Sequence, residues 1–203
     1  MHYLHVLFNQ LPISPNEVDH TFTVTGISDN SLRTQPGDLF VAVSGFTSDG
    51  HDYIDNAINK GAKAIVGERD ISGLSVPYFK TPNARYTLAQ LVARFYKREG
   101  QKQTIIGITG TNGKTTTSFM LKHILEQAGY SCALFGSVQT VINGIVSPSQ
   151  TNTTLGALDL HQHLAKSNDD FAVMEVSSHA LTQYRVAGIK FDLALFTNLS
   201  QDT

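Results

Sequence analysis

One segment, residues 104–116, limits the possible folds of this chain more than any other. Residues 104–109 form a short, β-branched run with the character of a buried parallel strand. A helical pattern follows almost at once, from about residue 114 to 127. Between them, Gly110 and Gly113 allow backbone conformations that other residues avoid. A strand that turns through glycines directly into a helix predicts an α/β fold with a parallel sheet.

The same turn has the composition of a phosphate-binding loop. In such loops, backbone N–H groups and the positive end of the helix dipole converge on a phosphate. Lys114 adds a positive charge for the β- and γ-phosphates of ATP, and the Thr115 hydroxyl can ligate Mg²⁺. Glycines lie at 107 and 110 rather than at 108, so the loop departs from the strict G-x-x-x-x-G-K-[ST] spacing. The predicted ATP-binding residues are Gly110, Thr111, Asn112, Gly113, Lys114, Thr115 and Thr116.

Short apolar runs alternate with helical patterns along the rest of the chain, which extends the α/β prediction to the whole sequence. The expected strands are 38–43, 64–66, 132–135, 171–176 and 192–197, and further helices are expected at 53–60 and 87–97. The polar segment 98–103 contains a glycine, so we predict domains at 1–100 and 101–203. The last expected strand ends close to Thr203. A parallel sheet of three or four strands would then expose apolar surface, and the second domain is expected to be incomplete.

Composition excludes several classes of protein. The 203 residues are 41% hydrophobic and 16% charged, which is enough apolar material for a packed core. A net charge of -2 without a basic block argues against nucleic-acid binding. Cys132 is the only cysteine, so no intramolecular disulfide can form. No segment has the length of a membrane-spanning helix, and the apolar N-terminus lacks the basic leader of a signal peptide. We predict a cytoplasmic monomer without membrane insertion.

Histidines do not form an independent metal site in this pattern. His161 and His163 lie two residues apart in an expected helix, so their side chains face apart. His179 is interpreted as structural, or as orienting its neighbours, rather than as a metal ligand.

Several motifs together resemble the Mur ligase family, and in particular its muramoyl-tripeptide synthetase branch. Residues 109–116 are similar to the family's ATP loop, which carries the shifted glycine and an Asn before Gly-Lys. Residues 36–45 and 49–51 resemble the branch's N-terminal domain, and 152–154 resemble its substrate-binding turn. Residues 174–181 and 196–199 resemble strand ends of its central domain. The resemblance implies a small α/β domain that binds a uridine nucleotide, followed by a truncated parallel-sheet domain that binds ATP.

The resemblance also implies an activity. Enzymes of this branch are ATP-dependent ligases of peptidoglycan synthesis that add the third amino acid to UDP-MurNAc-L-Ala-D-Glu. ATP phosphorylates the terminal carboxylate, which supplies a leaving group, and the amine of the amino acid attacks the acyl phosphate. The protein mainly positions the groups and neutralises phosphate charge. The implied partners are therefore small molecules: the UDP-MurNAc-dipeptide, ATP and an amino acid whose identity the sequence does not indicate.

By resemblance, Lys114 and Glu175 are the catalytic residues, and Thr115 and Glu175 are the Mg²⁺ ligands. A hard cation favours carboxylate oxygen, and Glu175 ends an expected strand, where α/β sheets place ligand-contacting groups. An exposed strand-end carboxylate is the structural alternative. The implied substrate-binding residues are Ser31, Phe46, Thr47, Ser48, Asn152, Thr153, Thr154, Ser177, Gln183 and Arg185.

Two departures from the family pattern matter. The family's Asp-Ser-Arg is Asn30-Ser31-Leu32 here, which weakens the uridine site, and Arg33 is the candidate to compensate. Family members continue beyond the position of Thr203 with a His-rich stretch, a carbamylated lysine for a second Mg²⁺ and an amino-acid-binding domain. We therefore expect these 203 residues to be a fragment that does not turn over alone.

Three alternatives to this interpretation predict different features of the sequence. A folylpolyglutamate or cyanophycin synthetase has a related loop, but residues 36–50 argue against both. A non-catalytic nucleotide-binding module belongs to a different functional class and stays open. A P-loop GTPase or kinase would need base-recognition motifs, and none is found.

Overall fold

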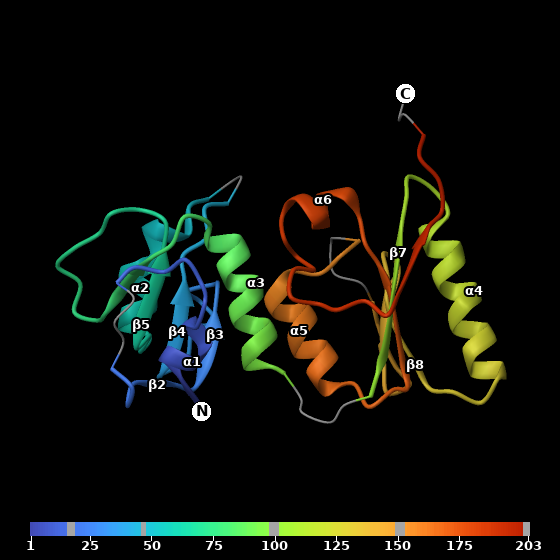
Figure 1. The fold of residues 1–203 in the computed structure, drawn as a ribbon, viewed down its shortest axis with the longest axis horizontal. Helices are drawn as coiled ribbons and strands as arrows, with labels where there is room; N and C mark the ends of the chain where they lie inside the picture. Colours follow the sequence, from blue (N-terminus) through green and yellow to red (C-terminus); the bar gives the residue numbers. More distant parts are fainter. Residues whose placement is uncertain (16–18, 46–47, 98–101, 149–152, 201–203) are drawn as a thin grey trace. The chain divides into compact units, whose positions relative to one another are not determined.

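The computed structural model describes residues 1–15, 19–45, 48–97, 102–148 and 153–200. The chain divides into two compact units, Met1–Phe95 and Tyr96–Thr203 (Figure 1). The predicted domain boundary, after residue 100, falls among residues 98–101, which lie outside the described residues. The proposed identities of the two domains stay predictions.

The first unit contains a four-stranded parallel sheet in the order β3-β4-β5-β6. Its strands are β3 (Gly26–Ser28), β4 (Asp38–Val41), β5 (Ala64–Gly67) and β6 (Tyr78–Lys80). Every residue of the two central strands is buried. A small antiparallel pair is formed by β1 (His2–Tyr3) and β2 (Thr23–Val24). The helices are α1 (Leu4–Phe8), the 3₁₀ turn η1 (Gly50–Tyr53), α2 (Ile54–Asn59) and α3 (Ala84–Phe95).

The residues just before two of these helices explain where they begin. The helix expected at 53–60 begins one residue later as α2, because η1 occupies the chain up to Tyr53. Helix α3 begins before the expected residue 87. Its start is fixed by Asn83, whose side-chain oxygen accepts a hydrogen bond from Tyr86 N at 2.9 Å.

The second unit contains a six-stranded sheet in the order β10-β9-β8-β11-β7-β12. Four strands run parallel: β7 (Thr104–Thr109), β8 (Cys132–Phe135), β11 (Phe171–Glu175) and β12 (Leu193–Phe196). An unpredicted antiparallel hairpin, β9 (Gln139–Ile142) and β10 (Ile145–Pro148), extends the sheet. The helices are α4 (Lys114–Gln127), α5 (Ala157–Lys166) and α6 (Ser178–Thr182). The predicted α/β fold class with parallel sheets is confirmed.

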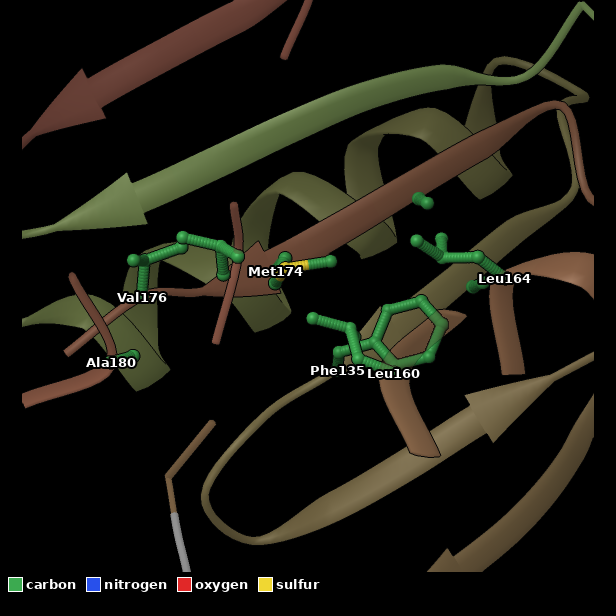
Figure 2. Close-up of a cluster of buried hydrophobic side chains, with 9 residues drawn as sticks. Phe135, Leu160, Leu164, Met174, Val176 and Ala180 are labelled. Carbon is green, nitrogen blue, oxygen red and sulfur yellow. The ribbon is translucent and has the colours of Figure 1, made fainter. Parts of the chain in front are cut away.

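Both faces of the central strands β7, β8 and β11 are covered. On one face, Phe135 and Met174 pack with Leu160 and Leu164 of α5 and Ala180 of α6 (Figure 2). On the opposite face, strand residues pack against Phe119, Leu121 and Leu125 of α4; they include Ile106, Ile108, Leu134 and Val173. Strands with both faces buried read as continuous apolar runs, which is why the sequence predicts them well.

The edge strand β12 is different from the central strands. All four of its residues are exposed, and Leu193 and Phe196 expose 58% and 64% of their surface. The expectation that this unit would expose apolar surface at its last strand is confirmed.

Candidate functional site

The predicted phosphate loop joins the carboxyl end of β7 to the first turn of α4. Gly113, the residue before α4, has a φ of +85° and no side chain to cap the helix. The first hydrogen bond of the helix, from Thr117 N to Gly113 O, measures 2.9 Å. The N–H groups of residues 113–116 therefore have no acceptor within the helix, which is the arrangement that binds a phosphate.

At Gly110, a residue with a side chain would force neighbouring atoms to move. Its φ is +132°, and an added Cβ would lie 2.2 Å from Thr197 Oγ1 and 2.9 Å from Asn198 O. The shifted glycine of the motif is therefore explained by close approach of the segment that follows β12.

That segment also holds two backbone amides of the loop. Asn198 O accepts a hydrogen bond from Thr111 N at 3.0 Å, and Asn198 Oδ1 accepts one from Asn112 N at 3.0 Å. The Thr197 hydroxyl donates to Asn112 O at 2.7 Å. These two amides thus fix the shape of the loop, and the amides of residues 113–116 are the better placed for a phosphate.

Lys114 brings its charge to the same loop. Its Nζ donates to Gly110 O at 2.7 Å and to Thr111 O at 2.9 Å. The ammonium group is therefore held over the loop rather than pointing into solvent.

Glu175 is the last residue of β11 and is fully buried. Oε2 accepts hydrogen bonds from Thr115 Oγ1 at 2.8 Å and from Ser137 Oγ at 3.0 Å. Oε1 accepts from Ser137 N at 3.1 Å and Ser118 Oγ at 3.4 Å. A buried carboxylate requires such donors. The alternative of an exposed strand-end carboxylate is therefore wrong.

The two predicted Mg²⁺ ligands meet although they lie 60 residues apart in sequence. A hydroxyl and a carboxylate oxygen are the donors that a hard cation takes, so Thr115 and Glu175 fit the ion chemically. Ser118 and Ser137 were not predicted from the sequence. One signal was available for Ser137, since it follows β8 closely, just as Glu175 ends the neighbouring β11.

Further predicted substrate residues lie beside Glu175. The Thr154 hydroxyl donates to Glu175 O at 2.9 Å and accepts from Ser177 N at 3.2 Å. Arg185 Nη1 donates to Thr154 O, and Arg185 Nη2 donates to Gln183 Oε1, both at 2.7 Å. The structure therefore brings Thr154, Ser177, Gln183 and Arg185 together.

These four residues differ in what they can offer a ligand. Thr154 is 3% exposed and its hydroxyl already binds the backbone, while Ser177 Oγ caps α6 by accepting from Ala180 N at 3.2 Å. Gln183 and Arg185 are half-buried and flank Tyr184, whose φ is +57°. Of the other two predicted residues, Thr153 is half-buried and Asn152 lies outside the described residues.

In the first unit, Ser31 and Ser48 line the same pocket of about 390 Å³. Phe40, Tyr53 and Arg85 also line it. Phe46 and Thr47 lie outside the described residues. Arg33, the candidate for compensation, is absent from the residues that line the pocket, and its guanidinium lies 3.8 Å from Asp29. The cation at this pocket is Arg85, which the sequence analysis missed.

Of the histidines of α5, His161 is buried and His163 is half-buried. Burial lowers the pKa of both His161 and His163, so both favour the neutral form. His179 of α6 is exposed. Across the described ranges, no group of three or more His, Cys, Asp or Glu side chains is arranged to hold a metal. Likewise, no helix within these ranges has the length and apolar character needed to cross a bilayer.

Comparison with known proteins matches both units to one family. Residues 108–202 match the Mur ligase middle domain, and residues 23–96 match the Mur ligase family catalytic domain. The chain belongs to the Mur ligase family.

Its relatives include the UDP-N-acetylmuramoyl-L-alanyl-D-glutamate--2,6-diaminopimelate ligase of Syntrophomonas wolfei. That protein is 42% identical over 88% of this chain and 37% of its own length. The ligase of the same name from Bacillus cereus is 40% identical over 100% of this chain and 41% of its own length. The chain thus spans about two fifths of the length of these curated relatives.

Solved structures agree with this assignment. A UDP-N-acetylmuramoyl-L-alanyl-D-glutamate--2,6-diaminopimelate ligase superposes with a TM-score of 0.80 at 26% identity, over 100% of this chain and 41% of that protein. The MurF ligase of Thermotoga maritima, solved in complex with ADP, superposes with a TM-score of 0.59 at 26% identity, over 89% of this chain and 39% of its own.

Proposed function

We propose that this chain is the uridine-nucleotide-binding and ATP-binding part of a ligase of peptidoglycan synthesis. The ligase adds an amino acid to UDP-MurNAc-L-Ala-D-Glu in an ATP-dependent reaction. The names of the relatives favour 2,6-diaminopimelate as that amino acid. The observation that carries the proposal is the 2.8 Å contact between Thr115 and Glu175 at the end of the phosphate loop.

The residues of the second unit suit the first half of this reaction. A carboxylate is a poor electrophile, and transfer of a phosphoryl group from ATP supplies it with a leaving group. The amides of residues 113–116 and the Lys114 ammonium are proposed to hold the phosphates and offset their charge. Thr115 and Glu175 would hold Mg²⁺, which supplies further positive charge at the phosphates when bound.

The other predicted residues are assigned to the muramoyl-peptide. Gln183 and Arg185 are proposed to contact its charged groups, because a planar guanidinium matches phosphate or carboxylate. Ser31 and Ser48 are proposed to contact the uridine nucleotide in the pocket of the first unit. The cytoplasmic location, the monomeric state and the absence of turnover by these 203 residues alone stay predictions.

Calorimetric titration with Mg-ATP tests the role of the loop. Lys114→Ala is expected to weaken binding about 100-fold or more, since a direct charge contact to phosphate is lost. Binding of a uridine nucleotide should be unchanged. Lys122→Ala is the matched control, because Lys122 lies on the same helix and pairs with Glu126 instead. Equal ATP affinity in the Lys114 variant would refute the assigned role.

A second titration, with UDP-MurNAc-L-Ala-D-Glu, tests the substrate class. The wild-type chain should bind it saturably, and Arg185→Ala should remove most of that binding. A folded wild-type sample that does not bind this compound would contradict the proposal.

A further inference from the structure

The pocket of the first unit has one cation among its lining residues. Its charged lining residues are Asp29 and Arg85, and the remainder are polar or apolar. Asp29 already lies 3.8 Å from the guanidinium of Arg33, which is 55% exposed. Asp29 therefore has a cation beside it that does not itself line the pocket.

The position of Arg85 on its helix is unusual for a cation. It is the second residue of α3, and positive charge in a first helical turn is disfavoured by the helix dipole. The first turn has no acidic residue of its own, although Glu68 Oε1 accepts a hydrogen bond from Ala84 N at 2.7 Å. A helix optimised only for stability would place an acidic residue here.

Arg85 is also tied to the turn that carries Ser48. Its Nη2 donates to Ser44 O at 2.7 Å. Gly45 N donates to Ser48 O at 2.9 Å, and Ser44 pairs with Asp49 across the turn. The guanidinium is thus held at the side of the pocket where Ser48 lies.

We propose that Arg85 binds the uridine nucleotide directly, by donating hydrogen bonds from its guanidinium to acceptor oxygens of the ligand. The inference rests on the proposed function of this pocket. The acceptor is an oxygen of the phosphates or a carbonyl oxygen of uracil, since both accept from a planar fork of donors. Arg85, rather than Arg33, then provides the arginine that the Asn30-Ser31-Leu32 segment lacks.

Calorimetric titration of UDP into four proteins tests this inference. Arg85→Gln is expected to weaken UDP binding about 10- to 100-fold, because a charge-assisted hydrogen bond is lost. The matched control, Arg33→Gln, removes the same charge from the same unit and should bind UDP within about twofold of wild type. Arg85→Lys should fall between wild type and Arg85→Gln.

The salt dependence of UDP binding distinguishes between the two possible acceptors on the ligand. If Arg85 contacts a phosphate, the difference between wild type and Arg85→Gln should shrink as salt is raised. If it contacts a uracil carbonyl, the difference should persist. Either result supports direct binding.

A purely structural role for Arg85 is tested by the ¹⁵N signals of the arginine side chains. The Nε–Hε signal that disappears in Arg85→Lys belongs to Arg85, and UDP should shift it in the wild-type protein while Mg-ADP should not. An unmoved signal at saturation, or wild-type affinity in Arg85→Gln, would overturn the inference. A wild-type chain that binds no uridine nucleotide would instead refute the proposed function of the pocket.

Discussion

The two candidate sites of this chain are built in different ways. In the second unit, the site combines helix amides with a fully buried carboxylate that accepts four hydrogen bonds. In the first unit, the pocket is lined by residues from loops, β4, η1 and α3, with Arg85 as its cation. The first kind of site depends on backbone geometry, so few substitutions in it are tolerated. The second kind depends on individual side chains, so its specificity can change while the fold is kept.

The largest effect is expected from removing the charge of Glu175, which should change the site of the second unit and leave that of the first unit unchanged. Glu175→Gln keeps the shape of the side chain but removes its negative charge and turns one acceptor into a donor that faces Thr115 or Ser137. We expect the enhancement of ATP binding by Mg²⁺ to fall about 100-fold. Titration of ATP with and without Mg²⁺ measures this enhancement.

The controls for that variant lie in both units. Glu126→Gln changes an exposed carboxylate of α4 and should leave the Mg²⁺ response intact. UDP binding by the first unit should be the same in all three proteins. A Mg²⁺ response that survives in Glu175→Gln would contradict the assignment of Glu175 as a ligand.

A smaller effect is expected within the phosphate loop, where two glycines can be compared. Gly110→Ala and Gly113→Ala both place an alanine at positive φ, but only at Gly110 would the new Cβ meet other atoms, at 2.2 Å from Thr197 Oγ1. Gly113→Ala should cost about 1–2 kcal/mol of stability from backbone strain alone, and Gly110→Ala should cost more. Urea unfolding of both variants measures the difference. Equal losses would show that the contact with Thr197 does not constrain the loop.

The smallest expected effect is a loss of stability of the second unit at acidic pH. Burial lowers the pKa of His161 and His163 in the folded second unit below their ordinary value of 6.5. As the pH falls through 6.5, the unfolded chain therefore takes up protons that the folded unit does not, and the free energy of unfolding decreases. Above that pH both states are neutral at these residues, and this contribution disappears.

Urea unfolding between pH 7.5 and 5.5 or so tests the acid effect. His161→Leu should show a smaller loss of stability on acidification than the wild type. His179→Gln is the control, because His179 is exposed. An unchanged pH dependence in His161→Leu would exclude that residue as a source of acid sensitivity.

The structure could be predicted from the sequence best where one short segment determines its own conformation. Strand β7, helix α4 and strand β8 have the bounds expected from the sequence, because apolar runs and glycine stops are local signals. The β9–β10 hairpin was missed although Asn143-Gly144 is a strong turn signal. Both residues have positive φ, at 52° and 76°, as a two-residue hairpin turn requires.

The candidate site residues show the same difference between local signals and features that depend on the fold. Lys114, Thr115 and Glu175 were predicted because they lie in motifs or at strand ends. Ser118, Ser137 and Arg85 were missed because their importance comes from which residues the fold brings beside them. Arg33, the candidate compensating arginine, lies close to Ser31 in sequence but does not line the pocket, so its role stays a prediction.

The bonds from Thr197 and Asn198 to the loop have a mechanical consequence. Asn198, which lies 86 positions beyond Asn112, holds the backbone amides of Thr111 and Asn112 in place. Any movement of the backbone just after β12 would therefore alter the shape of the loop that is proposed to bind ATP. The conformation of the chain just beyond Phe196 would therefore affect the affinity of the loop for a nucleotide. By the same coupling, a bound nucleotide would favour one conformation of that segment.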